Sequence, residues 1–279
     1  VIYNGIDMDE FDRQAAQRCT LFSEFPQLEN KSLIGMVGRI AKVKGTLDFV
    51  EAAAKIAAAR SDTYFLIVGN PQEQEYAEQV NKRVFELNLQ DRVIFTGART
   101  DVPSLLQRFS LLVVASLKEG FSYSCLEGMA ARLPVISTRC GGAEELVVDG
   151  ETGRLVPVGD VAQLAEAILS AIGDKSLMNG MGQAGRLRME RCFAGRQCAE
   201  RFEKLYQDVV QKYFGKRSSR IWVDVFMGLA SDLGMLGTRV QEHERLIRGL
   251  KDFEGLFKNN TLYRTLRSVH NTLSRKKRS

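Results

Sequence analysis

Histidine is scarce in this 279-residue chain, and its two copies, His243 and His270, both lie in the last quarter. Residues 1–215 therefore contain no imidazole base, which excludes a Ser-His or Cys-His nucleophile from that region. The five cysteines are odd in number and form no Cys-x-x-Cys pair. Neither a disulfide framework nor a zinc site is indicated, and a reducing compartment such as the cytoplasm suits the chain best.

Long apolar runs and a leader sequence are also missing. No stretch approaches the about 20 apolar residues needed to cross a bilayer. The first residues, VIYNG, have neither the charged region nor the cleavage site of a signal peptide. Because the sequence opens in mid-pattern without an initiating Met, we expect that an upstream segment has been removed.

The net charge of +5 is unevenly distributed. Residues 216–279 contain fourteen Lys and Arg against six Asp and Glu, and residues 1–215 contain a slight excess of acidic side chains. Apolar residues recur in this tail at helical spacing, which predicts amphipathic helices with a basic end. Three interpretations stay open: packing on the domain, attachment to an anionic membrane surface at the inner face of the cytoplasmic membrane, and pairing with another copy or another protein. Nucleic-acid binding is disfavoured because the basic residues do not alternate with aromatic ones on a known module.

Strands and helices alternate along the rest of the chain. Short apolar runs predict strands at 33–37, 64–68, 92–95, 111–115, 134–137 and 154–156, and helical patterns fall at 46–59, 73–87, 102–107, 123–131, 144–147, 161–172, 177–191 and 195–214. Residues 1–11 are expected to be the end of a strand, an Asn-Gly turn and an irregular approach, and residues 12–31 a loop or short helix. The predicted fold class is α/β, a doubly wound parallel sheet that binds ligands beyond the carboxyl ends of its strands.

The stretch 110–138 carries the clearest chemical signal. The turn Gly120-Phe121-Ser122 joins a buried strand to a short helix, so unpaired backbone N–H groups and a positive dipole end meet at a site that suits an anion. Glu119 and Glu127 bracket this turn, and ionised carboxylates accept hydrogen bonds from hydroxyl groups. A ligand with both an anion and several hydroxyls, such as a nucleotide sugar, fits these residues. An ordinary helix start with solvated carboxylates is the alternative.

A second candidate site is the loop 38–45, GRIAKVKG. Arg39 and Lys44 follow the first strand, where a doubly wound sheet holds phosphate, and both cations suit phosphate oxygens. The loop is neither a Walker motif nor a GxGxxG fingerprint. Alone, it is slightly better explained as two surface cations beside a glycine cap, and the turn between Glu119 and Glu127 changes that balance.

Several motifs in order resemble one family. GRIAKVKG, EGFSYSCLEGMA, LPVIST and GGAEELVVDGETGRLV are similar to the C-terminal, nucleotide-sugar-binding domain of the retaining GT-B glycosyltransferases of family four, and the resemblance spans about residues 1–214. It implies a Rossmann-like half of a GT-B fold in residues 1–215, a helical C-terminal extension at 216–279, and an N-terminal acceptor-binding domain that is absent from this chain.

The resemblance also implies residue roles. Arg39 and Lys44 would neutralise the diphosphate of the departing nucleotide. Glu119, the first glutamate of the E-x7-E signature, would hold hydroxyls of the donor sugar, and Glu127 would accept hydrogen bonds from the ribose.

The remaining contacts implied by the resemblance come mainly from the backbone. Gly38 and the N–H groups of Gly120, Phe121 and Ser122 would contact the sugar or the phosphates, and the loop around Arg99 would flank the base. No cofactor and no metal are expected. The sugar would pass with retention to a saccharide or lipid-linked acceptor, by front-face attack with the leaving phosphate as base.

Three positions depart from the family pattern. Ser122 and Gly128 stand where Gly and Ala are usual, and Ser122 fits if its φ is negative, where it can cap the helix. Arg132 replaces a Gly, so it must take a left-handed conformation or reshape the helix end.

Other functions stay open at this point. A noncatalytic nucleotide-sugar-binding or scaffolding subunit that acts through the basic tail is the main alternative. An epimerase or phosphorylase of the GT-B type is disfavoured by the E-x7-E pattern.

Overall fold

The computed structural model describes residues 2–214, so the basic extension predicted for 216–279 lies outside the described residues. A compact unit ends at Phe202 and a second unit begins at Glu203, inside the last helix of the described residues. The boundary predicted at residue 215 stays a prediction. Among the described residues, no helix is both long and apolar enough to span a membrane.

The centre of the compact unit is a parallel sheet in the order β3-β2-β1-β4-β5-β6. Its strands are β1 (Ser32–Val37), β2 (Thr63–Val68), β3 (Val93–Gly97), β4 (Leu111–Val114), β5 (Val135–Thr138) and β6 (Gly153–Val156). The chain winds outward from β1 to one edge, returns to β4 beside β1, and then winds to the other edge. This confirms the predicted doubly wound α/β fold.

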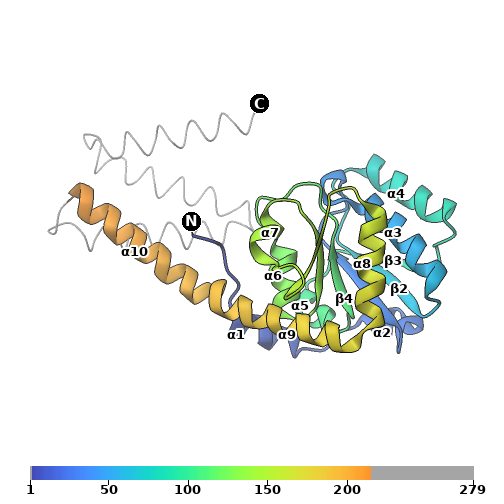
Figure 1. The fold of residues 1–279 in the computed structure, drawn as a ribbon, viewed down its shortest axis with the longest axis horizontal. Helices are drawn as coiled ribbons and strands as arrows, with labels where there is room; N and C mark the ends of the chain where they lie inside the picture. Colours follow the sequence, from blue (N-terminus) through green and yellow to red (C-terminus); the bar gives the residue numbers. More distant parts are fainter. Residues whose placement is uncertain (1, 215–279) are drawn as a thin grey trace. The chain divides into compact units, whose positions relative to one another are not determined.

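Helices cover both faces of the sheet (Figure 1). One face carries α3 (Thr46–Ala59), α4 (Gln74–Glu86) and α8 (Val161–Gly173), whose apolar residues form one core cluster with the sheet. The other face carries α1 (Met8–Ala15), α5 (Val102–Leu106), α6 (Tyr123–Ala130), α7 (Gly142–Leu146) and α9 (Lys175–Cys192), which share the second cluster. Shorter elements are α2 (Leu21–Glu24) and the 3-10 turns η1 (Pro26–Leu28) and η2 (Lys42–Lys44), and α10 (Gly195–Phe214) ends the described part.

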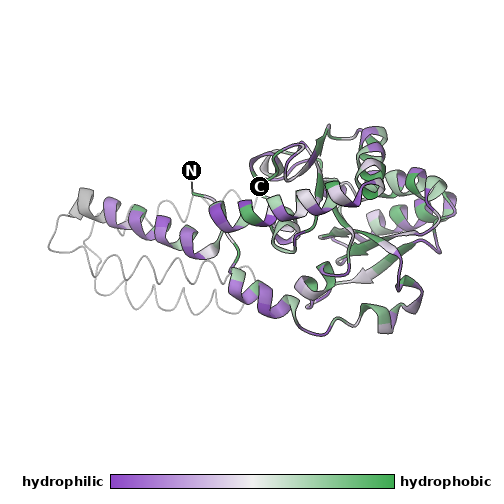
Figure 2. Cartoon of the chain, turned by 60° about the horizontal axis from the view of Figure 1, so that its bottom comes forward, coloured by the Kyte–Doolittle hydropathy of each residue, from purple (hydrophilic) through white to green (hydrophobic). Residues whose placement is uncertain are grey.

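The strands are apolar on both sides because both sides are covered. All four residues of β4 are buried, with Leu112 in one core cluster and Leu111 and Val113 in the other. Figure 2 shows the hydrophobic colour concentrated in the sheet and on the inner sides of the helices. This arrangement explains why short continuous apolar runs, rather than alternating ones, marked the strands.

The amino-terminal segment differs from its prediction. Helix α1 begins at Met8, where a strand end and an irregular approach were expected, because the Asp7 side chain accepts a hydrogen bond from the Glu10 amide at 3.0 Å. Before the helix, Ile6 forms an isolated parallel bridge with Ala194, so this segment pairs with the chain just ahead of α10.

Arg132 takes the left-handed conformation, with φ of 59°. This is one of the two outcomes expected at the position where the family has Gly. The Arg132 carbonyl oxygen lies 2.1 Å from where a Cβ on Gly182 would be, so α9 passes close to this turn because residue 182 has no side chain.

Candidate functional site

The strand order places the candidate site between β1 and β4, the neighbouring strands from which the chain turns toward opposite edges of the sheet. Such a reversal opens a crevice beyond the carboxyl ends of the two strands. Here the loops after β1 and β4 are joined, since the Leu117 amide donates to the Val43 carbonyl at 2.8 Å. A Cβ on Gly45, whose φ is +67°, would lie 1.9 Å from the Ala115 carbonyl oxygen, so only glycine permits this close approach.

Lys44 and Glu119, predicted separately from the two loops, are in direct contact. The Lys44 Nζ atom lies 2.6 Å from Glu119 Oε1, and the side chains are only 22% and 10% exposed. Ser116 Oγ donates to the same Oε1 atom at 2.8 Å. The Glu119 amide donates to the Cys140 carbonyl at 2.7 Å, which fixes the backbone of this residue to the loop after β5. The structure thus holds a cation and a carboxylate rigidly at the crevice.

The turn Gly120-Phe121-Ser122 leads into α6 as expected. Ser122 is the N-cap residue with φ of −96°, and its side chain accepts from the Cys125 amide. No hydrogen bond within the described residues uses the N–H groups of Gly120, Phe121 or Ser122. A Cβ on Gly120 would have no heavy atom within 4 Å, so the space beside this residue is open. Free N–H groups at a helix start are suited to an anion.

Glu127 lies on α6, eight residues beyond Glu119. Its side chain is partly buried and makes no hydrogen bond or ion pair with any described residue. Burial raises the pKa of Glu127 to about 7. A carboxyl group removed from water and left without a partner is costly, and such groups cluster at functional sites.

Gly38 and Arg39 lie in the loop after β1. Gly38 has φ of +146°, and the atom nearest to a Cβ placed on it would be Lys44 Cε, at 3.9 Å. Arg39 is exposed and forms no ion pair or hydrogen bond within residues 2–214. Its guanidinium is therefore unengaged by the rest of the described chain, in contrast to the Lys44 ammonium. The predicted ligand contacts of both residues stay predictions.

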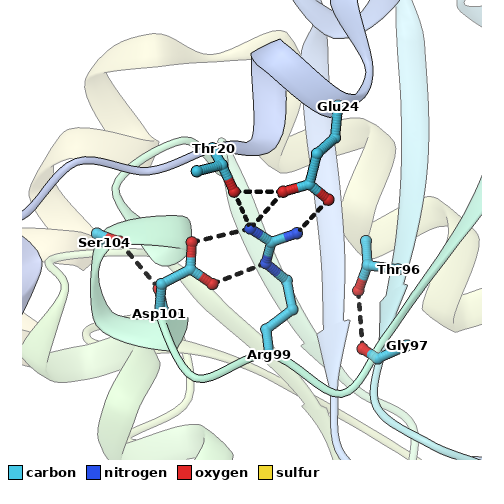
Figure 3. Close-up of polar contacts among 7 residues, drawn as sticks. All are labelled: Thr20, Glu24, Thr96, Gly97, Arg99, Asp101 and Ser104. Carbon is cyan, nitrogen blue, oxygen red and sulfur yellow. Dashed lines mark hydrogen bonds and ion pairs between the residues drawn. The ribbon is translucent and has the colours of Figure 1, made fainter.

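Arg99 is placed differently from the other predicted residues. Its guanidinium contacts Asp101 at 2.7 Å, Glu24 at 2.9 Å and Thr20 at 2.8 Å, and the side chain is only 7% exposed (Figure 3). The hydrogen bonds from Arg99 lower the pKa of both carboxyl groups, Asp101 and Glu24. This network fastens the segment around α2 to the loop after β3. The prediction that the loop around Arg99 flanks the base stays a prediction.

The sequence analysis did not identify Ser116 and Thr138 as site residues. Ser116 is buried and donates to Glu119, and its carbonyl accepts a hydrogen bond from the Thr138 hydroxyl. Only their positions in the sequence could have indicated them. Ser116 follows β4 and Thr138 ends β5, and polar residues at these places lie at the ligand-binding edge of a doubly wound sheet.

Metal binding was not expected, and one sequence feature bearing on it was overlooked. Asp7-Met8-Asp9 is an Asp-x-Asp triplet. In the structure Asp7 caps α1, and no group of three or more His, Cys, Asp and Glu within residues 2–214 is arranged to hold a metal ion. The triplet has a structural explanation in the helix start.

Comparison with known proteins identifies the family of the chain. The family model described as glycosyl transferases group 1 matches residues 19–188. The chain belongs to this family. The match includes both loops of the site and the whole sheet, so the resemblance seen in the motifs is confirmed.

Two relatives and one solved structure show the extent of the similarity. The chain is 33% identical over 211 residues to the N-acetyl-alpha-D-glucosaminyl L-malate synthase of Bacillus anthracis, covering 75% of this chain and 54% of that protein. It is 29% identical to the capsular polysaccharide biosynthesis glycosyltransferase CapM of Staphylococcus aureus, over 76% of this chain and 55% of that one. The structure of Anabaena Alr3699/HepE in complex with UDP and glucose superposes with a TM-score of 0.69 at 25% identity, covering 75% of this chain and 56% of that chain. This group 1 chain therefore spans about half the length of the proteins it matches.

Proposed function

We propose that this group 1 chain is the donor-binding part of a retaining glycosyltransferase that uses a nucleoside diphosphate sugar. The observation that carries the proposal is the contact between Lys44 and Glu119 at the β1–β4 crevice, beside three unpaired N–H groups at the start of α6. A diphosphate needs cations and N–H donors, and the hydroxyls of a sugar need carboxylate acceptors. The neighbouring structure in complex with UDP and glucose has the same fold.

In this proposal the charges of the site act mainly on the leaving group. Departure of the nucleotide leaves additional negative charge on the terminal phosphate, and Lys44 and the exposed Arg39 would stabilise that charge in the transition state. The N–H groups of Gly120, Phe121 and Ser122 would add fixed dipoles of the same sign. The leaving phosphate would accept the proton of the attacking hydroxyl, so attack from the same face would retain the anomeric configuration.

The two glutamates would have separate roles. Glu119 already accepts hydrogen bonds from Lys44 and Ser116 through Oε1, and Oε2 has no partner among the described residues. This free oxygen would accept from a hydroxyl of the donor sugar. Glu127, which has no partner, would accept from the ribose. Because the chain spans about half of its relatives, the acceptor, a saccharide or a lipid-linked saccharide, would be bound mainly by an N-terminal domain.

Nucleotide binding is the first test. Calorimetric titration of the chain with UDP, GDP and ADP is expected to give saturable binding of at least one of them without added metal. Gly120→Ala is the informative variant, because the added methyl group meets no protein atom within 4 Å and so should leave the melting temperature unchanged. It should nevertheless weaken binding by about tenfold if the open space receives the ligand. Equal affinity in both proteins would place the ligand elsewhere.

Transfer itself needs the full-length protein. The anomeric configuration of the product, followed by NMR from a hexosyl donor with a saccharide acceptor, should match that of the donor. An inverted product would overturn the retaining mechanism. Nucleotide binding without transfer to any acceptor would support the noncatalytic alternative.

A further inference from the structure

An aromatic cluster lies directly behind the turn that leads into α6. The ring of Phe121, the middle residue of the turn, stacks on Tyr3 with centroids 5.9 Å apart and an interplanar angle of 13°. Both rings also contact Phe193, at 5.7 Å from Tyr3 and 6.2 Å from Phe121. Aromatic pairs at these distances stabilise by about 0.5–1.5 kcal/mol beyond the burial of their surface.

Phe121 is the one residue of the turn whose side chain can transmit this support. On its backbone side the turn touches α7, because a Cβ on Gly142 would lie 2.6 Å from the Phe121 Cα atom. The space beside Gly120 is open, so no protein atom restrains the turn from that direction. The positions of the unpaired N–H groups therefore depend on the Phe121 ring as well as on the Glu119 backbone bonds and the Ser122 cap.

Tyr3 is itself held from several directions. The Glu145 carboxylate on α7 lies near its hydroxyl and raises the pKa of Tyr3. Its partner Phe193 lies under the Arg188 guanidinium at 5.6 Å, and Arg188 donates to the Leu146 carbonyl at 2.7 Å. Three residues beyond Tyr3, the Ile6 amide donates to the Phe193 carbonyl at 3.1 Å. The ring thus belongs to a fixed frame made of α7, α9 and the segment before α1.

We infer that Tyr3 is a positioning residue for the donor site: its ring braces Phe121 and thereby sets the N–H groups of Gly120, Phe121 and Ser122 in the geometry that receives the diphosphate. The ligand part of this inference rests on the proposed function. The structural part, that the Tyr3 ring restrains the turn, does not. The ring is required and the hydroxyl contributes less, because the stacked face is what contacts Phe121.

Three variants of the full chain separate these contributions. Tyr3→Phe keeps the ring, Tyr3→Leu removes it but keeps an apolar side chain, and Phe49→Leu removes a comparable edge-to-face pair with Phe65 in the core cluster on the other face of the sheet. The mobility of the turn is read from hydrogen exchange at two amides bonded to it: Gly142, which donates to the Glu119 carbonyl at 2.9 Å, and Leu126, which donates to the Ser122 carbonyl at 3.2 Å. Nucleoside diphosphate affinity is measured by calorimetry on the same proteins.

Tyr3→Leu should accelerate exchange at both amides and weaken nucleotide affinity by roughly three- to tenfold, the equivalent of a lost aromatic pair. Tyr3→Phe should stay within about twofold of the parent in affinity, because rescue by the conservative ring is what a stacking role requires. Phe49→Leu should lower the melting temperature without changing either readout. Tyr3→Leu combined with Phe121→Leu should weaken binding no further than Phe121→Leu alone, since Tyr3 acts through Phe121.

The two proposals can fail separately. If the parent binds none of UDP, GDP and ADP, the proposed function fails, and the exchange rates alone decide the inference. Unchanged exchange at Gly142 and Leu126 in Tyr3→Leu would overturn the inference. So would equal losses of affinity in Tyr3→Leu and Phe49→Leu, because general destabilisation would then explain both.

Discussion

Two regions at the carboxyl edge of the sheet differ in whether their charged groups have partners within the chain. After β3, the Arg99 guanidinium is buried and donates to Asp101, Glu24 and Thr20. After β1 and β4, Lys44 and Glu119 are bonded to each other, but Arg39, Glu127 and three backbone N–H groups have no partner among the described residues. A satisfied network holds the fold together, whereas unpaired groups at a crevice are available to a ligand. The comparison predicts that substitutions after β3 change stability and substitutions after β1 and β4 change binding.

The largest effect should come from Arg99→Met. Removing the cation leaves Asp101 and Glu24, whose side chains are 23% and 44% exposed, facing each other without it, so the loss of unfolding free energy should exceed the about 1 kcal/mol of an exposed ion pair. Chemical denaturation measures this loss, and nucleotide affinity should stay within about twofold of the parent. Arg60→Met is the matched control, because its ion pair with Asp62 is exposed and contributes at most about 1 kcal/mol. A selective loss of affinity in Arg99→Met would support the predicted contact with the base.

Lys44→Met should weaken binding, and it should also lower stability because it leaves the Glu119 carboxylate, which is only 10% exposed, without its cation. A charge-assisted hydrogen bond to phosphate contributes about 1.5–3 kcal/mol, so nucleoside diphosphate affinity should fall by roughly ten- to a hundredfold. Lys42→Met is the control, since Lys42 lies in the same 3-10 turn, carries the same charge and is exposed. Equal losses in the two variants would mean that general positive charge, rather than the Lys44 position, attracts the ligand.

The sheet and most of its helices could be predicted because their signals are local. Apolar runs gave the six strands, and α3 and α10 were predicted at their observed bounds, Thr46–Ala59 and Gly195–Phe214. Helix α1 was missed although Asp7 and Glu10 have the spacing of an N-cap and its third residue, a local signal that was available. The turn at Ser122 was predicted correctly, and Arg132 takes one of the two conformations that the sequence left open.

Ion pairs between residues far apart in the sequence could not be predicted from local signals. Lys44 meets Glu119 only because β4 returns to lie beside β1, and Arg99 meets Glu24 only because α2 packs near the loop after β3. Both pairs are separated by 75 residues. The sequence placed Arg39, Lys44 and Arg99 together as cations near a ligand, and the topology decides which of them is already engaged by the fold.

Glu127→Gln tests the unpaired carboxyl group at the crevice through the pH dependence of the unfolding free energy. The pKa of Glu127 is raised to about 7 in the folded chain, above the ordinary value of 4.5. The folded state therefore holds an extra proton between these values, and the parent loses stability as pH rises from about 4.5 to 7. Relative to the parent, Glu127→Gln should gain about 1–2 kcal/mol over this window, after allowance for the partial exposure of the side chain. Glu166→Gln, on the exposed side of α8, is the control for removing a helix carboxylate.

The same glutamate should release protons on ligand binding. If ribose hydroxyls donate to the ionised carboxylate, binding favours that form and lowers the pKa of Glu127. Titrations at pH about 6.5 in buffers of different ionisation enthalpy should then show release of a fraction of a proton, absent in Glu127→Gln. Proton uptake on binding would mean that the ligand prefers the neutral acid, contrary to the proposed role.

Ser122→Ala should give the smallest effect, and it tests whether the helix start belongs to the fold or to the ligand site. Loss of the cap costs about 1 kcal/mol, and because the cap anchors a turn with unpaired N–H groups, nucleotide affinity should also fall by roughly two- to threefold. Asp160→Ala is the matched control, since Asp160 caps α8 by accepting from the Gln163 amide at 2.9 Å, away from the crevice. It should lose similar stability with no change in affinity. If Ser122→Ala behaves like Asp160→Ala, the turn is held well enough without its cap, and the restraint on the N–H groups must come from the Phe121 ring behind it.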